Sequence, residues 1–407
     1  MENKSIRIFR LLNRFNLGGP TYNVSILTRS IGSPFETLLV GGVNQVYETD
    51  SLHIPHSMGI EPIVIPELKR SLLPWQDYKA YKKIKQKIKE YNPHIFHSHA
   101  SKAGALGRFA AKQLQVPVIV HTFHGHVFEA YFNKTLSSFF VHTERRLAKF
   151  SDAIIALSER QKKELVEKYR IAPEEKVHII PNGFDLEPYL KNHEEEKRVL
   201  FRNTYGVRDE EFALGWVGRL VSVKNPMMFA HVIHELLKLQ KKFKAFIVGD
   251  GVFMKEMVNY FEKHQIPYSF FPIPGAVVYF LSWQRDITSI LPGLDIMVLT
   301  SNNEGTPVSL IEAQVSRLPI VSTNVGGIQD IVIPNKTALL SSRGDVEAMV
   351  KNILFLMENP AYLFEMKKHG RDFVVKHFSY ELLVERMRNL YFDLLLKKGI
   401  TITRGDV

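Results

Sequence analysis

Short apolar runs alternate with amphipathic stretches along the whole chain, and this pattern predicts strands and helices in alternation. The run 295–300 is too short for a helix and is bounded by polar residues, which is typical of a buried parallel strand. Apolar residues then recur at helical spacing over 308–315, and another apolar strand is expected at 318–322. A unit of this order is a right-handed crossover, so its first loop lies at the carboxyl edge of a parallel sheet, where ligands of open α/β proteins bind.

The same alternation predicts elements in both halves of the chain. In the first half we expect a strand at 6–12 and helices near 21–30, 75–90 and 132–150. A second α/β unit begins with a predicted strand at 212–217, and only helices are expected after Leu340. A chain of 407 residues is long for one domain, so we expect two domains of about 200 residues each, joined near 184–205.

Composition narrows the class of protein. The chain has no cysteine, which excludes disulfides and thiolate metal sites and suits a reducing compartment. Its amino terminus is too charged for a signal-peptide core, and no stretch approaches ~20 uninterrupted apolar residues, so nothing is expected to span a membrane. The net charge is +11, and residues 1–200, with 29 Lys+Arg and 21 Asp+Glu, carry +8 of it. A basic half suggests an anionic partner, although lysine-rich, solvated helix faces explain the charge equally well.

Two glutamates in the second half carry candidate chemistry. Glu304 lies in the loop before the 308–315 helix, and Glu312 lies eight residues later on that helix. We expect Thr306 to cap the helix and Pro307 to be its first residue, which leaves the unpaired N–H groups of the first turn facing a phosphate. An acid beyond a phosphate site can accept hydrogen bonds from sugar hydroxyls. Taken alone, the two glutamates would be better explained as a solvated loop acid and a polar-face helix residue.

The stretch EGTPVSLIEA at 304–313 resembles the E-x7-E signature of retaining glycosyltransferases of family 4, the bacterial group 1 enzymes, and the resemblance continues through LPIVSTNVGGIQDIV. It implies an α/β protein with the GT-B fold, in which two Rossmann-like domains with parallel sheets face a central cleft. We therefore expect an acceptor-binding domain over 1–200, completed by a crossing helix at 380–397. A nucleotide-sugar-binding domain is expected over 206–379.

The loop GRLVSVKNP at 218–226 follows the 212–217 strand and places Arg219 and Lys224 around a helix start. Two cations and a helix amino end can neutralise a departing diphosphate without a metal. The resemblance implies catalytic roles for Arg219, Lys224 and Glu304 and a ribose contact for Glu312. It also implies that the donor phosphate and sugar contact the backbone of Gly305, Thr306, Pro307, Val308 and Ser309.

A glycine pair, Gly18 and Gly19, lies between the first strand and the first helix, where the backbone can approach a diphosphate closely. The resemblance implies that this loop faces the donor, and we include both glycines in the donor site. A Gly-Gly turn by itself is weak evidence for a diphosphate site, because two glycines often serve only to form a tight turn.

Histidines concentrate between 94 and 126. The element VHTFHGH resembles a T-x-H-G element that lies beside the reacting sugar in the family, which implies a catalytic role for His124. His99 and His126 are candidate acceptor or supporting residues, and both are equally well explained as structural histidines. No D-x-D occurs and the histidines lack converging carboxylates, so we expect no metal.

Three features depart from the family pattern. Ser282 and Arg317 stand where glycines are usual, and residues 272–275 make their region longer and richer in proline. These departures leave the nucleotide base and the donor sugar open.

Together these features predict a retaining hexosyl- or N-acetylhexosaminyltransferase that uses a nucleotide-diphosphate sugar, expected to be UDP-linked, and no cofactor. The expected acceptor is a glycan or lipid-linked sugar in surface polysaccharide biosynthesis. A cytoplasmic protein at the inner face of the membrane is expected, with peripheral contact between lysine-rich helix 75–90 and anionic lipid and no nucleic-acid partner. The alternatives are a GT-B sugar-nucleotide epimerase and a sugar-nucleotide-binding pseudoenzyme.

Overall fold

The computed structural model describes residues 5–16, 19–43, 51–69, 71, 73–124, 134–191, 194–284 and 286–400, without the side chains of 134–137. Gly18 and His126 lie outside the described residues. The chain forms two compact units, residues 1–184 with 378–407 (unit 1) and residues 185–377 (unit 2). No helix in the described part of the chain is long and apolar enough to cross a membrane.

The first unit ends earlier than the expected residue 200, because the segment after Phe184 packs on unit 2. Arg198 and Arg202 each bind a different oxygen of Asp295, at 2.7 and 2.9 Å. The Phe201 ring packs on Phe246, with centroids 4.8 Å apart. These contacts tie helix α9 (Glu194–Thr204) to unit 2.

Unit 1 contains, among the described residues, a sheet of seven parallel strands in the order β3-β2-β1-β4-β5-β6-β7. The strands are β1 (Ile6–Leu12), β2 (Phe35–Gly42), β3 (Ile63–Ile65), β4 (Ile95–His99), β5 (Val118–Thr122), β6 (Ala153–Ala156) and β7 (Val177–Ile179). The helices are α1 (Gly19–Ser30), α2 (His53–Ser57), α3 (Pro74–Tyr91), α4 (Ser101–Gln113), α6 (Lys134–Phe150), α7 (Glu159–Lys163) and α15 (Tyr380–Lys397).

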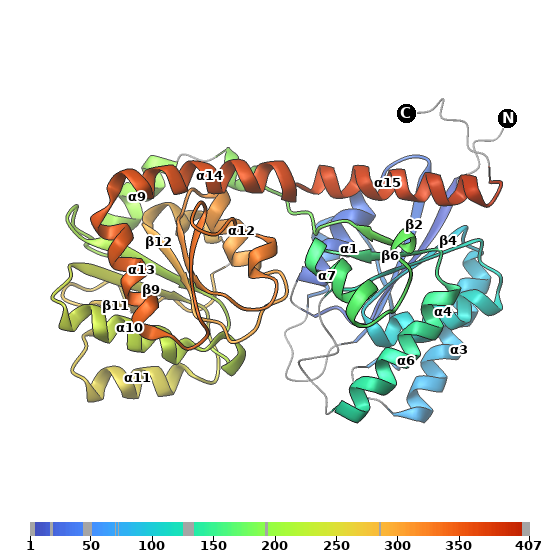
Figure 1. Cartoon of the computed structure of the whole chain (residues 1–407), viewed down its shortest axis with the longest axis horizontal. Helices are drawn as coiled ribbons and strands as arrows, with labels where there is room; N and C mark the ends of the chain where they lie inside the picture. The colour runs from blue at the N-terminus through green and yellow to red at the C-terminus, as the bar shows by residue number, and fades with distance from the viewer. Residues whose placement is uncertain are drawn as a thin grey trace. The chain divides into compact units, whose positions relative to one another are not determined.

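Helices cover both faces of this sheet (Figure 1). Phe9, Leu11 and Phe96 pack against α3 and α4, whereas Ile8 and Ile95, which alternate with them along β1 and β4, pack against α1 and α15. Strands buried on both faces read as the continuous apolar runs seen in the sequence.

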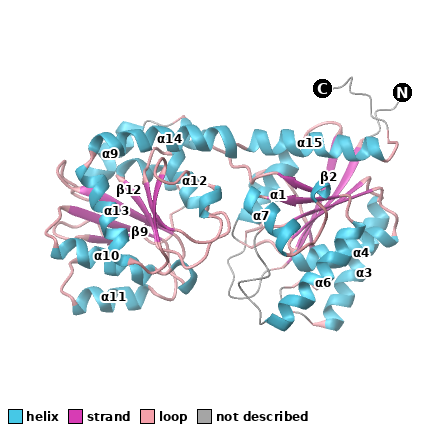
Figure 2. Ribbon diagram, viewed as in Figure 1, coloured by secondary structure: helices cyan, strands magenta, loops and turns pink. Residues whose placement is uncertain are grey.

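Unit 2 contains, within its described residues, a second sheet of seven parallel strands in the order β10-β11-β9-β8-β12-β13-β14 (Figure 2). The strands are β8 (Phe212–Val217), β9 (Phe243–Val248), β10 (Tyr268–Ser269), β11 (Val278–Phe280), β12 (Ile296–Leu299), β13 (Ile320–Thr323) and β14 (Ala338–Ser341). Besides α9, the helices are α8 (Glu187–Leu190), α10 (Pro226–Lys238), α11 (Met254–Lys263), α12 (Val308–Val315), α13 (Val346–Glu358) and α14 (Pro360–Phe378).

Both sheets reverse their strand order beside their first strand. The reversal falls between β1 and β4 in unit 1 and between β8 and β12 in unit 2. Ligands of open α/β sheets bind in the crevice beyond the carboxyl ends of the strands at such a switch point. The loops after these four strands are therefore the places to look for a site in each unit.

Candidate active site

The switch point of unit 2 brings together a cation and an acid that the sequence placed 80 residues apart. Lys224 follows β8 and Glu304 follows β12, and the Lys224 Nζ lies 2.6 Å from Glu304 Oε1. The Ser301 hydroxyl donates to the same Oε1 at 2.6 Å. Both charged side chains are mostly buried, at 18% and 9% exposed. Because solvent screens such a pair only weakly, each side chain is firmly positioned.

Close backbone contacts hold the Glu304 loop. A Cβ at Gly326 would lie 1.9 Å from the Glu304 carbonyl oxygen, and one at Gly327 would lie 2.1 Å from that of Gly305. The Gly327 N–H also donates to the Glu304 carbonyl at 3.0 Å. The adjacent glycines Gly326 and Gly327 therefore allow one loop at the carboxyl edge of the sheet to pack closely against the next.

Helix α12 starts one residue later than predicted. Pro307 is its N-cap residue and supplies no side-chain cap, so the prediction that Thr306 caps the helix is wrong. The proline ring has no group that can accept from the first-turn N–H groups. Gly305, Thr306, Val308 and Ser309 are all at least partly exposed, so a phosphate can reach this helix end.

Arg219 lies on the loop after β8. Its side chain is exposed and makes no ion pair with any residue that the structure describes. A Cβ at Gly249 would lie 1.9 Å from the Gly218 carbonyl oxygen, so the loops after β8 and β9 are in close contact. Arg219 thus projects from a well-packed backbone and is available to an anion.

Glu312 has a partner that the sequence analysis missed. The Tyr189 hydroxyl, on α8, donates to Glu312 Oε1 at 2.7 Å. Burial raises the pKa of the Glu312 carboxyl, and the Tyr189 hydrogen bond lowers it to a smaller extent. Within the described residues no other group hydrogen-bonds this carboxylate, so Oε2 remains for a ligand.

In unit 1, the histidines gather at the carboxyl ends of β4 and β5. His99 Nδ1 and His124 Nε2 are 2.8 Å apart and share one hydrogen bond. His97 Nε2 pairs with the Thr122 hydroxyl at 2.8 Å, and its Nδ1 pairs with the Tyr391 hydroxyl of α15 at 2.6 Å. The His97 and His99 rings also pack together, with centroids 4.2 Å apart.

Burial lowers the pKa of each of these imidazoles. The pKa of His124 falls to about 4, and those of His97 and His99 lie well below their ordinary value. The buried Arg10, which donates to the Tyr391 hydroxyl at 3.3 Å, adds to the effect on His97. At neutral pH His124 is therefore an uncharged hydrogen-bonding group. His124 Nδ1 and His99 Nε2 have no hydrogen-bond partner in the described structure, which leaves them able to bind a polar ligand.

The remaining predicted residues fall as follows. Gly19 begins α1, and a Cβ there would meet nothing within 4 Å, so close packing does not require a glycine at this position. Among the described His, Asp and Glu residues no group of three or more is arranged to hold a metal ion. Whether turnover needs a metal stays a prediction.

The backbone conformation explains why glycine is usual at the positions of Ser282 and Arg317. Ser282 and Arg317 both adopt left-handed conformations, with φ of 50° and 58°. Only glycine adopts this region without a steric cost. The departures from the family pattern therefore keep the backbone shape and place side chains on strained positions.

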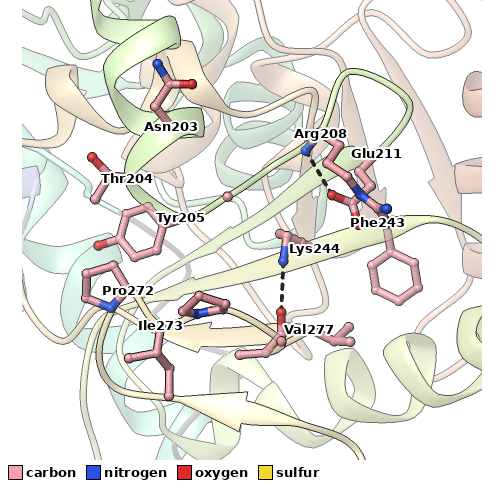
Figure 3. A pocket seen from close by; sticks show the side chains of 14 residues that line it. Asn203, Thr204, Tyr205, Arg208, Glu211, Phe243, Lys244, Pro272, Ile273 and Val277 are labelled. Atoms are coloured by element: carbon pink, nitrogen blue, oxygen red, sulfur yellow. Dashed lines mark hydrogen bonds and ion pairs between the residues drawn. The ribbon is translucent and has the colours of Figure 1, made fainter.

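A hollow lined in part by residues 272–275 is remote from this chemistry. It has a volume of about 440 Å³ and lies where β8, β9 and β11 begin, at the amino edge of the sheet. Figure 3 shows Tyr205, Arg208 and Lys244 among its lining residues, with Lys244 donating to the backbone. It contains none of the predicted site residues, so we assign it no part in the reaction.

Two Rossmann-like units with parallel sheets, one with a lysine, an acid and an open helix end at its switch point, define a protein with the GT-B fold. Comparison with known families agrees: the family model described as Glycosyltransferase Family 4 matches residues 22–188, and that described as Glycosyl transferases group 1 matches residues 198–373. The chain belongs to the group 1 glycosyltransferases of family 4, and it is a transferase.

Characterised relatives act in polysaccharide, capsule and lipid-linked sugar synthesis. The chain is 29% identical over 345 residues to the UDP-Gal:alpha-D-GlcNAc-diphosphoundecaprenol alpha-1,3-galactosyltransferase of Escherichia coli, covering 83% of this chain and 85% of that one. It is 27% identical over 342 residues to the capsular polysaccharide biosynthesis glycosyltransferase CapM of Staphylococcus aureus, covering 82% and 85%. Among solved structures, Anabaena Alr3699/HepE in complex with UDP superposes with a TM-score of 0.78 at 17% identity, covering 95% of this chain and 99% of that one. The fold prediction is therefore confirmed.

Proposed function

We propose that the protein is a retaining glycosyltransferase that moves a hexose or N-acetylhexosamine from a UDP-sugar to a lipid-linked sugar during surface polysaccharide synthesis. The observation that carries the proposal is the Lys224–Glu304 pair at the switch point of unit 2, beside the open amino end of α12. This arrangement offers positive charge where a diphosphate must leave and an acid where a sugar must be held.

Each polar group then has a role in donor binding. Arg219, Lys224 and the first-turn N–H groups of α12 stabilise the negative charge that develops on the departing diphosphate. Glu312 accepts from ribose hydroxyls through Oε2, while Tyr189 holds Oε1. When the diphosphate binds Lys224, the Lys224–Glu304 ion pair breaks and Glu304 hydrogen-bonds the donor sugar instead.

Retention is proposed to proceed by same-face attack. Glu304 is the acid nearest the phosphate-binding elements, and its carboxylate already accepts from Lys224 and Ser301. A carboxylate held in this way is a weak nucleophile. The uncharged His124, in unit 1, is proposed to orient the acceptor or the donor sugar by a hydrogen bond.

The acceptor proposal rests on chemistry of unit 1 and on the relatives. The name of the Escherichia coli relative contains a diphosphate-linked polyprenol as acceptor. Helix α3 exposes Trp75 at 68% and Tyr78 at 48%, and Lys79 and Lys82 lie over these rings at 5.4 and 4.8 Å. Exposed aromatics with lysines suit peripheral contact with an anionic membrane on the cytoplasmic side. Three aromatic residues that follow His124 in the sequence, Phe128, Tyr131 and Phe132, lie outside the described residues.

The test is release of nucleoside diphosphate from a panel of UDP- and GDP-sugars, with and without a synthetic polyprenyl-diphosphate N-acetylglucosamine acceptor. We expect UDP release that depends on the acceptor, a product with the donor's anomeric configuration by NMR, and loss of both on changing Lys224 to alanine. An inverted product, or release of no diphosphate from any donor, would contradict the proposal.

A further inference from the structure

A second, strongly basic hollow lies in unit 1. It has a volume of about 780 Å³ and is formed by the carboxyl-terminal half of α6 and the segment 166–176. Its charged lining consists of Arg145, Arg146, Lys149, Arg170 and Lys176, with His142 beside them and no carboxylate among the lining residues. Its remaining lining is apolar, from Ala148, Val166, Ile171, Ala172 and Pro173.

This hollow is separate from the histidine cluster. Lys149 and Lys176 immediately precede the region where β6 and β7 begin, at the amino edge of the sheet, whereas His99 and His124 lie at the carboxyl edge. A strand of four residues separates the two edges by about 13 Å. A ligand in the hollow is therefore not bound at the predicted reacting centre.

Two of the five cations hold the walls in place. Arg145 Nε donates to the Tyr169 carbonyl and Lys176 Nζ donates to the Ser151 carbonyl, each at 2.9 Å. Both contacts go to uncharged carbonyls, so the two positive charges are not neutralised.

The other three cations form no ion pair with any described residue. Arg146, Lys149 and Arg170 are all exposed. Glu174 is directed elsewhere, because it pairs with Lys162 at 3.1 Å. Cations gathered without a carboxylate repel one another, and an anion relieves this repulsion.

We propose that this hollow binds the phosphate of an anionic phospholipid headgroup. Phe139 is 63% exposed and lies on the same face of α6 as His142, Arg146 and Lys149, at spacings of three and four residues. An exposed aromatic residue beside a cationic hollow with apolar walls fits a headgroup at a lipid surface, whereas a free phosphate uses neither the apolar walls nor Phe139. The inference is independent of the proposed transfer reaction.

The test is co-sedimentation of the full chain with phosphatidylcholine vesicles that contain or lack phosphatidylglycerol. The pocket variant combines Arg146→Gln, Lys149→Gln and Arg170→Gln, which removes three charges and keeps both wall contacts. Glutamine suits position 170, whose φ is 48°, because Gln115 and Gln240 adopt similar angles in this chain. The charge-matched control combines Lys255→Gln, Lys263→Gln and Lys368→Gln, all exposed residues of unit 2.

We expect the wild type and the control to bind only the anionic vesicles and the pocket variant to bind them about a hundredfold more weakly. Phe139→Ser should weaken binding with the charges intact. Wild-type binding by the pocket variant, or equal losses in the pocket variant and the control, would overturn the proposal. Full competition by inorganic phosphate would identify a free-anion site instead. UDP release with a soluble acceptor should be unchanged in the pocket variant, so failure of this inference is distinguishable from failure of the proposed function.

Discussion

Mild acid should unfold unit 1 before unit 2. Three buried imidazoles, His97, His99 and His121, and the half-buried imidazole of His124 surround the ends of β4 and β5. Burial is the main cause that lowers the pKa of each, to about 4 for His124 and well below the ordinary value for the others. Arg108, beside His121, adds to its shift.

Folding stability decreases in acid because the unfolded chain binds protons that the folded chain does not. A histidine whose pKa is lower in the folded state than its ordinary value of 6.5 takes up a proton in the unfolded chain first, so stability is lost as the pH falls through 6.5. For His124, lowering the pH to about 5.5 costs about 1.4 kcal/mol. The losses from His97, His99 and His121 add to this cost in the same direction, because burial lowers the pKa of each well below the ordinary value. A domain is stable by only about 5–15 kcal/mol.

Native-state hydrogen exchange with mass-spectrometric detection can measure each unit separately. After correction for the intrinsic exchange rate, protection in peptides covering β4 and β5 should fall by more than about 1.4 kcal/mol between about pH 8 and pH 5.5. Peptides covering β8 and β9 serve as the internal reference. His121→Asn should reduce the slope of unit 1, since it removes one of the four titrating groups. Equal slopes in the two units, or a slope that His121→Asn leaves unchanged, would refute the reasoning.

Three further predictions concern the site, and a fourth concerns the backbone at Arg317. Glu312→Gln should weaken donor binding at least tenfold by calorimetry, since a hydrogen bond to a charged group contributes about 1.5–3 kcal/mol. The donor affinity of the wild type should decrease as the pH is lowered, because burial raises the pKa of the Glu312 carboxyl. Unchanged affinity would remove Glu312 from the site. Arg219→Ala combined with Lys224→Ala should abolish turnover, because it removes two cations that stabilise the departing diphosphate. Excess chelator should leave turnover unchanged. A strict requirement for magnesium or manganese would contradict the prediction of a metal-independent reaction. His124→Ala should lower kcat far more than donor affinity, and wild-type turnover would return it to a structural role. Arg317→Gly should raise the free energy of unfolding by about 1 kcal/mol in a urea titration, because it relieves a left-handed backbone; destabilisation would show that the arginine side chain contributes contacts.

Elements with a strong local period were predictable from the sequence. The strand at 6–12 and the helix at 380–397 have the predicted bounds, and the predicted strand at 295–300 is present as β12. Their apolar residues recur with the period of the element, and burial in the core follows that period. The left-handed backbone at Ser282 and Arg317 was not predicted, although the usual glycines at these two positions were a signal for it.

Contacts between residues far apart in the chain were not predictable in this way. Tyr189 lies 123 positions before Glu312, and Tyr391 lies 294 positions after His97. No local period records such a pairing. The end of the first domain was misplaced for the same reason, because Arg198 belongs to unit 2 through Asp295, almost a hundred residues later.

The two acids of the E-x7-E motif are placed in different electrostatic surroundings, which suits different tasks. Glu304 lies against Lys224, so in the proposed reaction a diphosphate that binds this lysine would weaken the existing pair and free the carboxylate for the donor sugar. Among the described residues, only the Tyr189 hydroxyl donates to Glu312, and burial disfavours the charged form of this carboxyl unless further hydroxyl donors bind it. Ribose hydroxyls can donate such hydrogen bonds, whereas amide and phosphate oxygens only accept and cannot donate to this carboxylate. Donor binding is therefore expected to stabilise the ionised form of Glu312, so that the donor releases a proton on binding near the raised pKa. Calorimetry in buffers of different ionisation enthalpy measures that proton directly, and a donor that binds without proton release at any pH would show that Glu312 does not receive the ribose.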